Sequence, residues 1–361
     1  MVNMRLHHNN LMSQVASIKV LGQAFAYVKH ARIKAHYNDD IWHLSRKKDQ
    51  VIARIRQSLL QGTYQLQPLT ICRGYSRWCA EDAVVLKALS VVISEALNVK
   101  PVSNTMDVSS ASHLKGQGGI KGALAKAHKI ARSKRHHFMI KTDIKSFYQS
   151  IHHQTLLSQC SKAIHDTRIL DLIEQYCERC EIMGGHHTVV KRQGIPMGCP
   201  LSPLMGAVYL TPIDQMVKGT SCAYVRYMDD FIIFIQSRFQ LRRMLKRLYG
   251  VLKDLKLTLA QDKTYIGRIS HGFNFLGFHH HPSGVGVSPN TLSRMFQKLA
   301  WLYEQQASRK RLQAYLKRWQ TWVNSQVGDL RFPIKFNSNP NPLKPIRISL
   351  SLTNQGYVLS L

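Results

Sequence analysis

Residues 223–235 read AYVRYMDDFIIFI, two β-like runs on either side of Met228-Asp229-Asp230. Apolar runs that flank a short polar break predict a β-hairpin, here with two acids at its tip. Adjacent carboxylates repel each other, and a bound cation would relieve that repulsion. An ordinary acidic turn is the alternative interpretation. It is weakened because the chain has only 20 Asp and Glu residues, and these two stand between apolar runs.

A third carboxylate follows another apolar run, in FMIKTDIKSFY at 138–148. Phe138–Ile140 predicts a short strand that ends near Asp143. Phosphoryl transfer from a nucleoside triphosphate requires neutralised charge on the attacking and leaving oxygens. Two divalent ions about 4 Å apart can provide it, and Mg²⁺ prefers carboxylate oxygens. A polymerase therefore needs aspartates brought together from different strands, and Asp143, Asp229 and Asp230 are the candidates.

The stretch between these acids includes QGIPMGCPLSPLMGAVYL at 193–210. Its glycines, Gly194 and Gly198, allow close backbone approach. Ser202-Pro203 predicts the N-cap and first position of a helix over 204–210. The amides at such a helix start can bind an anion or a ribose. A plain turn before a core helix would have a similar sequence.

The charge balance points to a nucleic acid partner. Fifty Lys and Arg residues against 20 Asp and Glu give a formal charge of +30 and a pI of about 10.1. A polyanion would offset this self-repulsion. The basic residues run through the whole chain, which disfavours a membrane-surface segment. No apolar run is long enough to span a bilayer and no signal peptide is recognisable, so we expect a cytoplasmic protein without a membrane partner.

The seven cysteines are scattered and odd in number, which predicts no disulfide framework and suits a reducing cytosol. Cys177 and Cys180 form one C-x-x-C pair close to His186 and His187. This pair is open to two interpretations, a zinc site or two cysteines on one helix face. The histidine run 279–281 is expected in a loop and is not interpreted as a metal site.

Helical periodicity predicts the elements around the central region. Residues 11–33 carry apolar side chains at three- and four-residue steps, which predicts one amphipathic helix, and a second helix should end at Gly62. Ser288-Pro289 predicts the start of another helix. Two stripes of apolar residues after it predict two helices, and the alternating pattern of 346–352 predicts a strand. The apolar stripe residues are Leu292, Met295, Leu299, Leu302, Leu312, Leu316, Trp319 and Val323.

The motifs D-x-x-x-F-Y (143–148), P-x-G-x-P-L-S-P (196–203) and Y-M-D-D (227–230), in this order, resemble the palm motifs of reverse transcriptases. LTLAQDKTYIG (257–267) and FNFLGF (273–278) are similar to the segments that follow. RWCAEDAVVLKAL (77–89) and SHLKGQGGIKGAL (112–124) resemble finger segments of bacterial group II intron-like enzymes. The resemblance covers about 70–278.

The resemblance implies an α+β right-hand polymerase. Such a fold has fingers, a palm with an antiparallel sheet packed on helices, and a helical thumb. We expect four regions: an N-terminal helical extension (1–65), a fingers and palm core (66–282), a helical thumb (283–327) and a C-terminal tail (328–361).

The resemblance also implies catalytic roles. Asp143 and Asp229 would hold two Mg²⁺ ions, for which Mn²⁺ could substitute, with the carbonyl of Ile144 as a further ligand. Asp230 would support the site and contact the ions less directly. Lys263 matches the lysine proposed to protonate the leaving pyrophosphate, and a solvated surface lysine is the alternative.

The substrate-binding roles are implied in the same way. Tyr148 would lie under the sugar and exclude a 2′-hydroxyl. Met197 and Gly198 would lie beside the incoming nucleotide. Met197 stands where many members have Gln, so we expect relaxed or biased base selection. Arg73 or Arg77 would grip the triphosphate. The FLGF segment at 275–278 would form a primer grip, or its phenylalanines would be core residues.

The expected function is that of an RNA-directed DNA polymerase in bacterial antiphage defence. Its partners would be an RNA template, for which a dedicated non-coding RNA is one candidate, the cDNA product and dNTPs. A mobile-element polymerase, an idle maturase-like RNA-binding protein and an RNA-dependent RNA polymerase are the alternatives. The sequence leaves the oligomeric state open.

Overall fold

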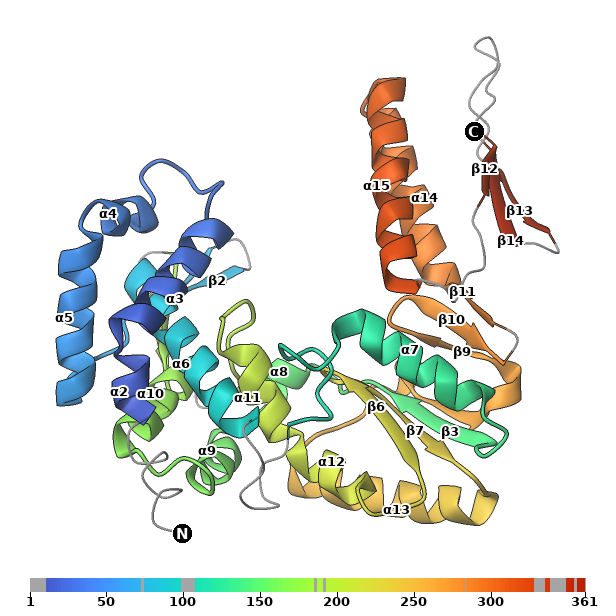
Figure 1. The fold of residues 1–361 in the computed structure, drawn as a ribbon, viewed down its shortest axis with the longest axis horizontal. Coiled ribbons are helices and arrows are strands. Elements are labelled where there is room, and N and C mark those ends of the chain that lie inside the picture. Colours follow the sequence, from blue (N-terminus) through green and yellow to red (C-terminus); the bar gives the residue numbers. More distant parts are fainter. Residues whose placement is uncertain are drawn as a thin grey trace. The chain divides into compact units, whose positions relative to one another are not determined.

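The computed structural model describes residues 11–72, 75–98, 108–184, 187–190, 193–282, 284–327, 335–337, 349–353 and 356–360 (Figure 1). The chain divides into two compact units, each described by itself. Unit 1 comprises Met1–Leu114, Asp143–Thr220 and Met244–Asp262, and unit 2 comprises Lys115–Thr142, Ser221–Arg243 and Lys263–Leu361. Both combine helices with small sheets, which confirms the predicted α+β class.

The N-terminal helices of unit 1 pack around a long central helix. They are α2 (Leu11–Val15), α3 (Ile18–Ala31), α4 (Asp40–Arg46), α5 (Lys48–Gln61) and the central α6 (Ala80–Asn98). The prediction of one helix over 11–33 was wrong. The Ser17 side chain accepts a hydrogen bond from the Val20 amide and starts a new helix, so Ile18 is 68% exposed instead of joining the apolar stripe. The predicted end at Gly62 is confirmed, with φ of 70°.

The sheet of unit 1 has the order β2-β1-β4-β5. Its strands are β1 (Leu69–Cys72), β2 (Tyr75–Arg77), β4 (Cys180–Met183) and β5 (His187–Val190). The β1–β4 pair is parallel and the other two are antiparallel. The other helices of unit 1 include α8 (Phe147–Ser150), α9 (His153–Ser161), α10 (Thr167–Cys177), α11 (Ser202–Tyr209) and α12 (Thr211–Val217).

The two cysteines of the C-x-x-C pair do not share a helix face. Cys177 is the last residue of α10, whereas Cys180 is the first residue of β4. That interpretation was wrong, because the helix ends inside the motif. Within the described ranges, no group of three or more His, Cys, Asp or Glu side chains could hold a metal ion. His186 lies outside those ranges.

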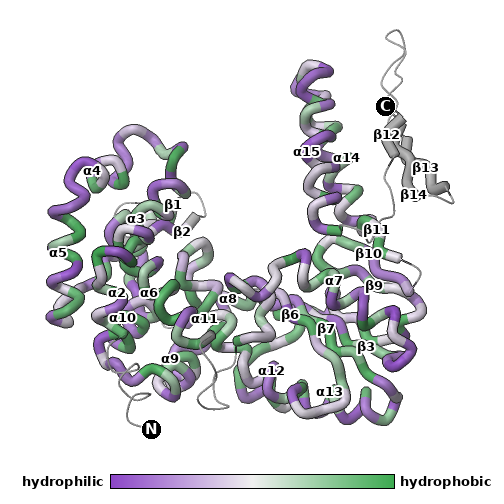
Figure 2. The backbone as a smooth tube through the Cα atoms, viewed as in Figure 1, coloured by the Kyte–Doolittle hydropathy of each residue, from purple (hydrophilic) through white to green (hydrophobic). Residues whose placement is uncertain are grey.

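The main sheet of unit 2 is antiparallel, with the order β6-β7-β3-β8. Its strands are β3 (Phe138–Thr142), β6 (Ala223–Tyr227), β7 (Asp230–Ile235) and β8 (Tyr265–Arg268). This confirms the predicted hairpin and the predicted strand at 138–140. Helix α7 (Gly119–Arg132) contacts β6 and β7, and the hydrophobic colour follows β7 (Figure 2). Helix α13 (Arg238–Asp254) continues from unit 2 into unit 1.

The rest of unit 2 joins a small antiparallel sheet to two long helices. The elements are β9 (Phe273–Phe275), β10 (Phe278–His281), β11 (Gly284–Val287), α14 (Pro289–Glu304) and α15 (Arg309–Val327). The predicted Ser288 cap is confirmed, because its side chain accepts from the Thr291 amide. The two predicted stripes are also confirmed, since seven of their eight residues are buried and Trp319 packs against the same core. Strands β12 (Lys335–Asn337), β13 (Ser349–Thr353) and β14 (Gly356–Ser360) form a third sheet.

The histidine run forms part of strand β10, so its prediction as a loop was wrong. His280 points into the core, where its ring stacks on Phe273 with centroids 5.0 Å apart. Burial, and then the neighbouring His128, lowers the pKa of His280 to about 3. A neutral imidazole therefore serves as a core residue here. No helix within the described ranges is both long and apolar enough to cross a bilayer.

Candidate active site

The β6–β7 hairpin closes over two residues, because Tyr227 pairs with Asp230 across the strands and only Met228 and Asp229 lie between them. Met228 has φ of 56°, which is unusual for a residue other than glycine. Arg226 is fully buried in β6, and its Nη1 donates a hydrogen bond of 3.2 Å to the Met228 carbonyl oxygen. A buried guanidinium therefore braces the strained tip that carries the acids.

Both acids of the hairpin are half-buried. A Lys141 Nζ in the neighbouring strand lies 4.0 Å from Oδ1 of Asp230. Such an ion pair, open to water on one side, contributes modestly to stability. It brings a positive charge to Asp230 from within the same sheet.

Asp143 directly follows strand β3 in the chain. The last residue of β3, Thr142, pairs with Phe231 in β7 and contacts Thr264 with 2.7 Å between the hydroxyl oxygens. Beyond the strand, the Asp143 carbonyl oxygen accepts from the Ala260 amide at 2.9 Å, and Ile144 forms a bridge with Leu259. The backbone around Asp143 is therefore held by hydrogen bonds on its C-terminal side.

The donor chemistry at these positions fits magnesium. Asp143, Asp229 and Asp230 are half-buried carboxylates, the oxygen ligands that this ion prefers. Magnesium at phosphoryl-transfer sites is commonly held by one or two carboxylates together with water and substrate phosphates, rather than by a cage of protein side chains. Among the described residues no group of three or more His, Cys, Asp or Glu side chains is placed to hold a metal ion, so these three acids do not form such a group in the structure.

The 193–202 loop of unit 1 is held by bonds from side chains. Gly194 has φ of 80°, and a Cβ there would lie 2.9 Å from the Gln149 carbonyl oxygen. The Gly194 carbonyl oxygen accepts from Arg179 Nη1 at 3.0 Å and contacts His153 Nε2 at 2.8 Å. Only glycine can occupy this position without displacing the backbone.

Ser202 does not cap the following helix as predicted, because Leu201 is the N-cap and no side-chain cap bond forms. The Ser202 hydroxyl instead bonds the Pro196 carbonyl oxygen at 2.5 Å and the Tyr176 hydroxyl at 2.6 Å. The helix starts two residues earlier than predicted, at Ser202 itself, with Pro203 in its first turn. Ser202 thus closes the 193–202 loop from within the core.

Tyr148 lies against both the loop and α11. Its carbonyl oxygen accepts from the Ile195 amide at 2.8 Å. A Cβ on Gly206 would lie 3.2 Å from its ring and 3.0 Å from the ring of Phe147. Gly206 therefore makes room for both rings. Sequence reasoning missed it, although a glycine inside a predicted helix was the available signal. Met197 and Gly198 are exposed in the same loop.

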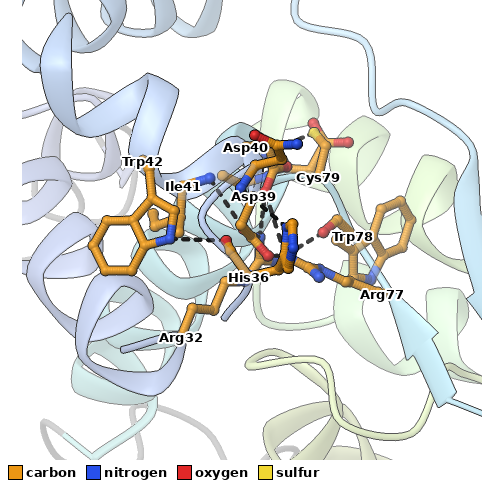
Figure 3. A network of polar contacts seen from close by, with 12 residues as sticks. Arg32, His36, Asp39, Asp40, Ile41, Trp42, Arg77, Trp78 and Cys79 are labelled. Carbon is orange, nitrogen blue, oxygen red and sulfur yellow. Dashed lines mark hydrogen bonds and ion pairs between the residues drawn. The ribbon is translucent and has the colours of Figure 1, made fainter. Parts of the chain in front are cut away.

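Arg77 lies in a polar network of unit 1 (Figure 3). Its guanidinium bonds Asp39 and lies 3.4 Å from Asp40, which also accepts a 3.0 Å bond from Arg32. Burial opposes ionisation of Asp39, but the hydrogen bonds from Arg77, Asp40 and the Ile41 amide together outweigh it, and the pKa of Asp39 is lowered. Sequence reasoning missed these two acids. Asp39 also caps α4, and this capping pattern was the available signal. Arg73 lies outside the described residues.

Lys263 and the FLGF segment both lie in unit 2. Lys263 is exposed at the end of a short 3₁₀ turn, Gln261–Lys263. Phe275 and Phe278 are buried core residues that pair across a turn formed by Leu276 and Gly277, both with positive φ. The Gly277 carbonyl oxygen accepts from the Ser288 amide at 3.0 Å and from Thr291 Oγ1 at 2.9 Å. The turn is thereby tied to the start of α14.

Comparison with known proteins finds related chains that share part of this sequence. Protein YkfC of Escherichia coli (strain K12) is 28% identical over 182 residues, which cover 40% of this chain and 46% of that protein. Protein P of ground squirrel hepatitis virus (strain 27) is 28% identical over 138 residues, which cover 38% of this chain and 15% of that protein. The chain thus spans less than half the length of these curated relatives.

Among solved structures, apo telomerase from Candida tropicalis, truncated from its C-terminal domain, aligns with a TM-score of 0.46 at 15% identity. The alignment covers 56% of this chain and 45% of that chain. A family model described as reverse transcriptase (RNA-dependent DNA polymerase) matches residues 76–280, more than half of the sequence, and the chain therefore belongs to the reverse transcriptase family.

Proposed function

We propose that the chain is an RNA-directed DNA polymerase that synthesises cDNA from dNTPs on an RNA template. The observation that carries this proposal is the register of β3 against β7, in which Thr142 pairs with Phe231. Asp143 is the next residue after Thr142, and Asp230 is the residue before Phe231. The strands are antiparallel, so these acids leave the sheet at the same end, where the hairpin also carries Asp229.

Asp143 and Asp229, with the Ile144 carbonyl, would hold two Mg²⁺ ions, which would neutralise charge on the attacking and leaving oxygens. Asp230 would support them, with Lys141 limiting carboxylate repulsion. Arg226 would keep the tip in place through the Met228 carbonyl. The exposed Lys263 would donate a proton to the leaving pyrophosphate.

Tyr148 would select the sugar. Its ring is fixed from behind by Phe147 and by the α11 backbone at Gly206, so it could not retreat from a 2′-hydroxyl. Exposed Met197 and Gly198 would face the incoming nucleotide. Arg73 or Arg77 would contact the triphosphate. Arg77 would contact the triphosphate while its guanidinium stays near Asp39 and Asp40.

A primer-extension assay tests this function. With Mg²⁺, an RNA template and a DNA primer, the wild-type chain should incorporate dNTPs in preference to rNTPs. Asp229→Ala should lower the rate by on the order of 10³-fold or more, because charge at the reacting oxygens is no longer neutralised. Asp49→Ala, which removes an exposed acid from the first turn of α5, is the matched control and should leave the rate unchanged. Wild-type extension by Asp229→Ala would refute the proposal.

We further propose that the template is a dedicated non-coding RNA and that the enzyme acts in antiphage defence. This rests on the resemblance of the chain to bacterial reverse transcriptases, whose stand-alone members include enzymes linked to phage defence that often copy a dedicated non-coding RNA. Sequencing the RNA that copurifies with the chain, and comparing phage plating on cells with wild-type or Asp229→Ala protein, tests both points. A recovered group II intron RNA would instead favour the mobile-element role.

A further inference from the structure

A pocket of about 460 Å³ lies in unit 1 between α9 and the C-terminal end of α13. None of the residues that line it has been given a role above. They are His152, Gln154, Thr155, Ser158, Gln159, Lys162, Pro212, Val251, Asp254, Leu255 and Lys256. Most of the lining residues are polar. The volume of the pocket is in the range of sites that hold small ligands.

Lys256 reaches across this pocket. Its Nζ lies 2.9 Å from Nε2 of His152, whose Nδ1 lies 3.1 Å from Thr155 Oγ1. An ammonium group can only donate, so Nε2 accepts and the proton of the neutral ring is on Nδ1. Burial, and then the charge of Lys256, lowers the pKa of His152, in agreement with a neutral ring. The positive charge therefore stays on Lys256.

The backbone of Lys256 is unusual. It has φ of 54° and follows α13 in a C-terminal motif in which its amide bonds the Lys253 carbonyl oxygen and the Leu257 amide bonds that of Leu252. Helix α5 ends in the same way, with amide bonds from Gly62 to Leu59 and from Thr63 to Ser58. There the left-handed position is a glycine, the residue that this motif normally uses. A lysine costs stability at this position. Gln306, with φ of 53°, occupies the same position after α14, where its amide bonds the Tyr303 carbonyl oxygen and the Ala307 amide bonds that of Leu302, so the backbone conformation of Lys256 does not by itself mark a functional site.

The charges around the pocket favour an anion. Lys256 and Lys162 line it, Lys253 is exposed nearby, and Asp254 is the acid in the lining. Helix α9 begins at the pocket with His152 as its N-cap and has no side-chain cap bond. The amides of its first turn can therefore add to the attraction of an anion. Hydroxyl and amide side chains on α9, from Gln154 to Gln159, supply further polar contacts.

We propose that this pocket binds a backbone phosphate of RNA, with Lys256 as its principal contact. The ligand class, a phosphodiester in RNA, rests on the proposed function, because that activity brings an RNA strand to the protein. Phosphate contacts of this kind position an RNA without reading its sequence. The pocket would thus hold the RNA through a contact separate from the carboxylates of the hairpin.

Lys256→Gly separates this role from a structural one. Glycine relieves the left-handed strain, so the melting temperature should rise or stay the same. Affinity for a fluorescein-labelled RNA hairpin should nevertheless fall about 3- to 10-fold at 0.15 M salt. The slope of log K against log salt should become shallower by about one unit, because one phosphate contact is lost. Lys256→Arg should retain most of the affinity.

Arg56→Ala is the matched control, because it removes an exposed cation from α5. It should change the RNA affinity and the salt slope less than Lys256→Gly does. Lys162→Ala, on the same pocket, should lower affinity and the salt slope in the same direction as Lys256→Gly. Unchanged RNA affinity and salt slope in Lys256→Gly would overturn the proposal. Because RNA and DNA share the phosphodiester group, an equal loss for a DNA hairpin of the same sequence would support the phosphate contact and show that it does not select RNA.

The primer-extension test of Asp229→Ala is independent of this one. If Asp229→Ala extends primers normally while Lys256→Gly loses RNA affinity, the polymerase proposal fails and the pocket stands as an RNA site. If Asp229→Ala is inactive while Lys256→Gly binds RNA normally, the polymerase proposal stands and the pocket proposal fails.

Discussion

The β6–β7 hairpin and the 193–202 loop carry the residues assigned to metal and nucleotide, and they are held in different ways. The hairpin is fixed by a strand ladder that continues to its last pair, Tyr227 with Asp230. The loop has no strand partner and depends on Arg179, His153 and Ser202, which bond its carbonyl oxygens. The shape of the first segment is a property of backbone pairing, whereas the shape of the second combines backbone bonds from the Gly194 and Ile195 amides with bonds from buried side chains.

The difference has an energetic consequence. Arg179 forms a 2.8 Å ion pair with Glu181, and their side chains are 6% and 3% exposed. A buried pair is costly to break because one charge is left without compensation. In the hairpin the buried Arg226 side chain bonds the Met228 carbonyl oxygen, but the register is set by the strand ladder. Substitutions should therefore affect the 193–202 loop far more than the hairpin tip.

The largest effect is expected for Arg179→Met. It leaves the Glu181 carboxylate buried without its partner and removes a donor to Gly194, so the free energy of unfolding should fall by about 3–5 kcal/mol. Urea denaturation measures it. Arg54→Met is the matched control, since the Arg54–Glu81 pair is 67% and 35% exposed and should be worth less than about 1 kcal/mol. Equal losses in the two variants would show that burial of the Arg179–Glu181 pair adds nothing to its contribution to stability.

An intermediate effect is expected for Ser202→Ala. This substitution removes the hydroxyl that links Pro196 to Tyr176. The buried Pro196 carbonyl oxygen and the buried Tyr176 hydroxyl each lose their bond to Ser202. Unfolding free energy should fall by about 1–3 kcal/mol. Thermal denaturation alongside Ser161→Ala, an exposed serine of α9, provides the comparison. A loss no larger than that of the control would show that the loop does not depend on this hydroxyl.

The smallest effect is expected for Met228→Gly at the hairpin tip. Glycine relieves the positive φ but gains freedom in the unfolded chain, so the two contributions should nearly cancel, with a net change below about 1 kcal/mol. The midpoint of urea denaturation measures it. A loss comparable to that of Arg179→Met would mean that the tip, like the loop, depends on one side chain.

Local patterns were sufficient for much of the architecture. The strand at Phe138, the Met228 hairpin and the helix starting after Ser288 were all predicted, because apolar alternation, a polar break and a Ser-Pro cap act over a few residues. The assignment to the reverse transcriptase family likewise followed from ordered motifs. The grouping into four regions and the roles of individual site residues stay predictions.

The helix break at Ser17 depends on a local cap, a bond to the Val20 amide, although the apolar spacing continues across it. Contacts between distant residues caused other failures. Ser202 bonds Tyr176, 26 residues away, instead of capping its helix. Arg77 meets Asp39, 38 residues away. No local window contains both partners of such pairs, so no spacing rule could have found them.

The amino-acid sequence by itself determined the order of elements, the acidic hairpin, the excess of positive charge and the family. Those properties depend on neighbouring residues, whose backbone preferences and periodicity act before any tertiary contact forms. The tertiary structure alone decided that Arg179 holds Gly194, that Gly206 makes room for the ring of Tyr148, and that Lys256 occupies a position usually left to glycine. Each of these depends on which distant atoms are brought within a few ångströms, and only the packed chain specifies that.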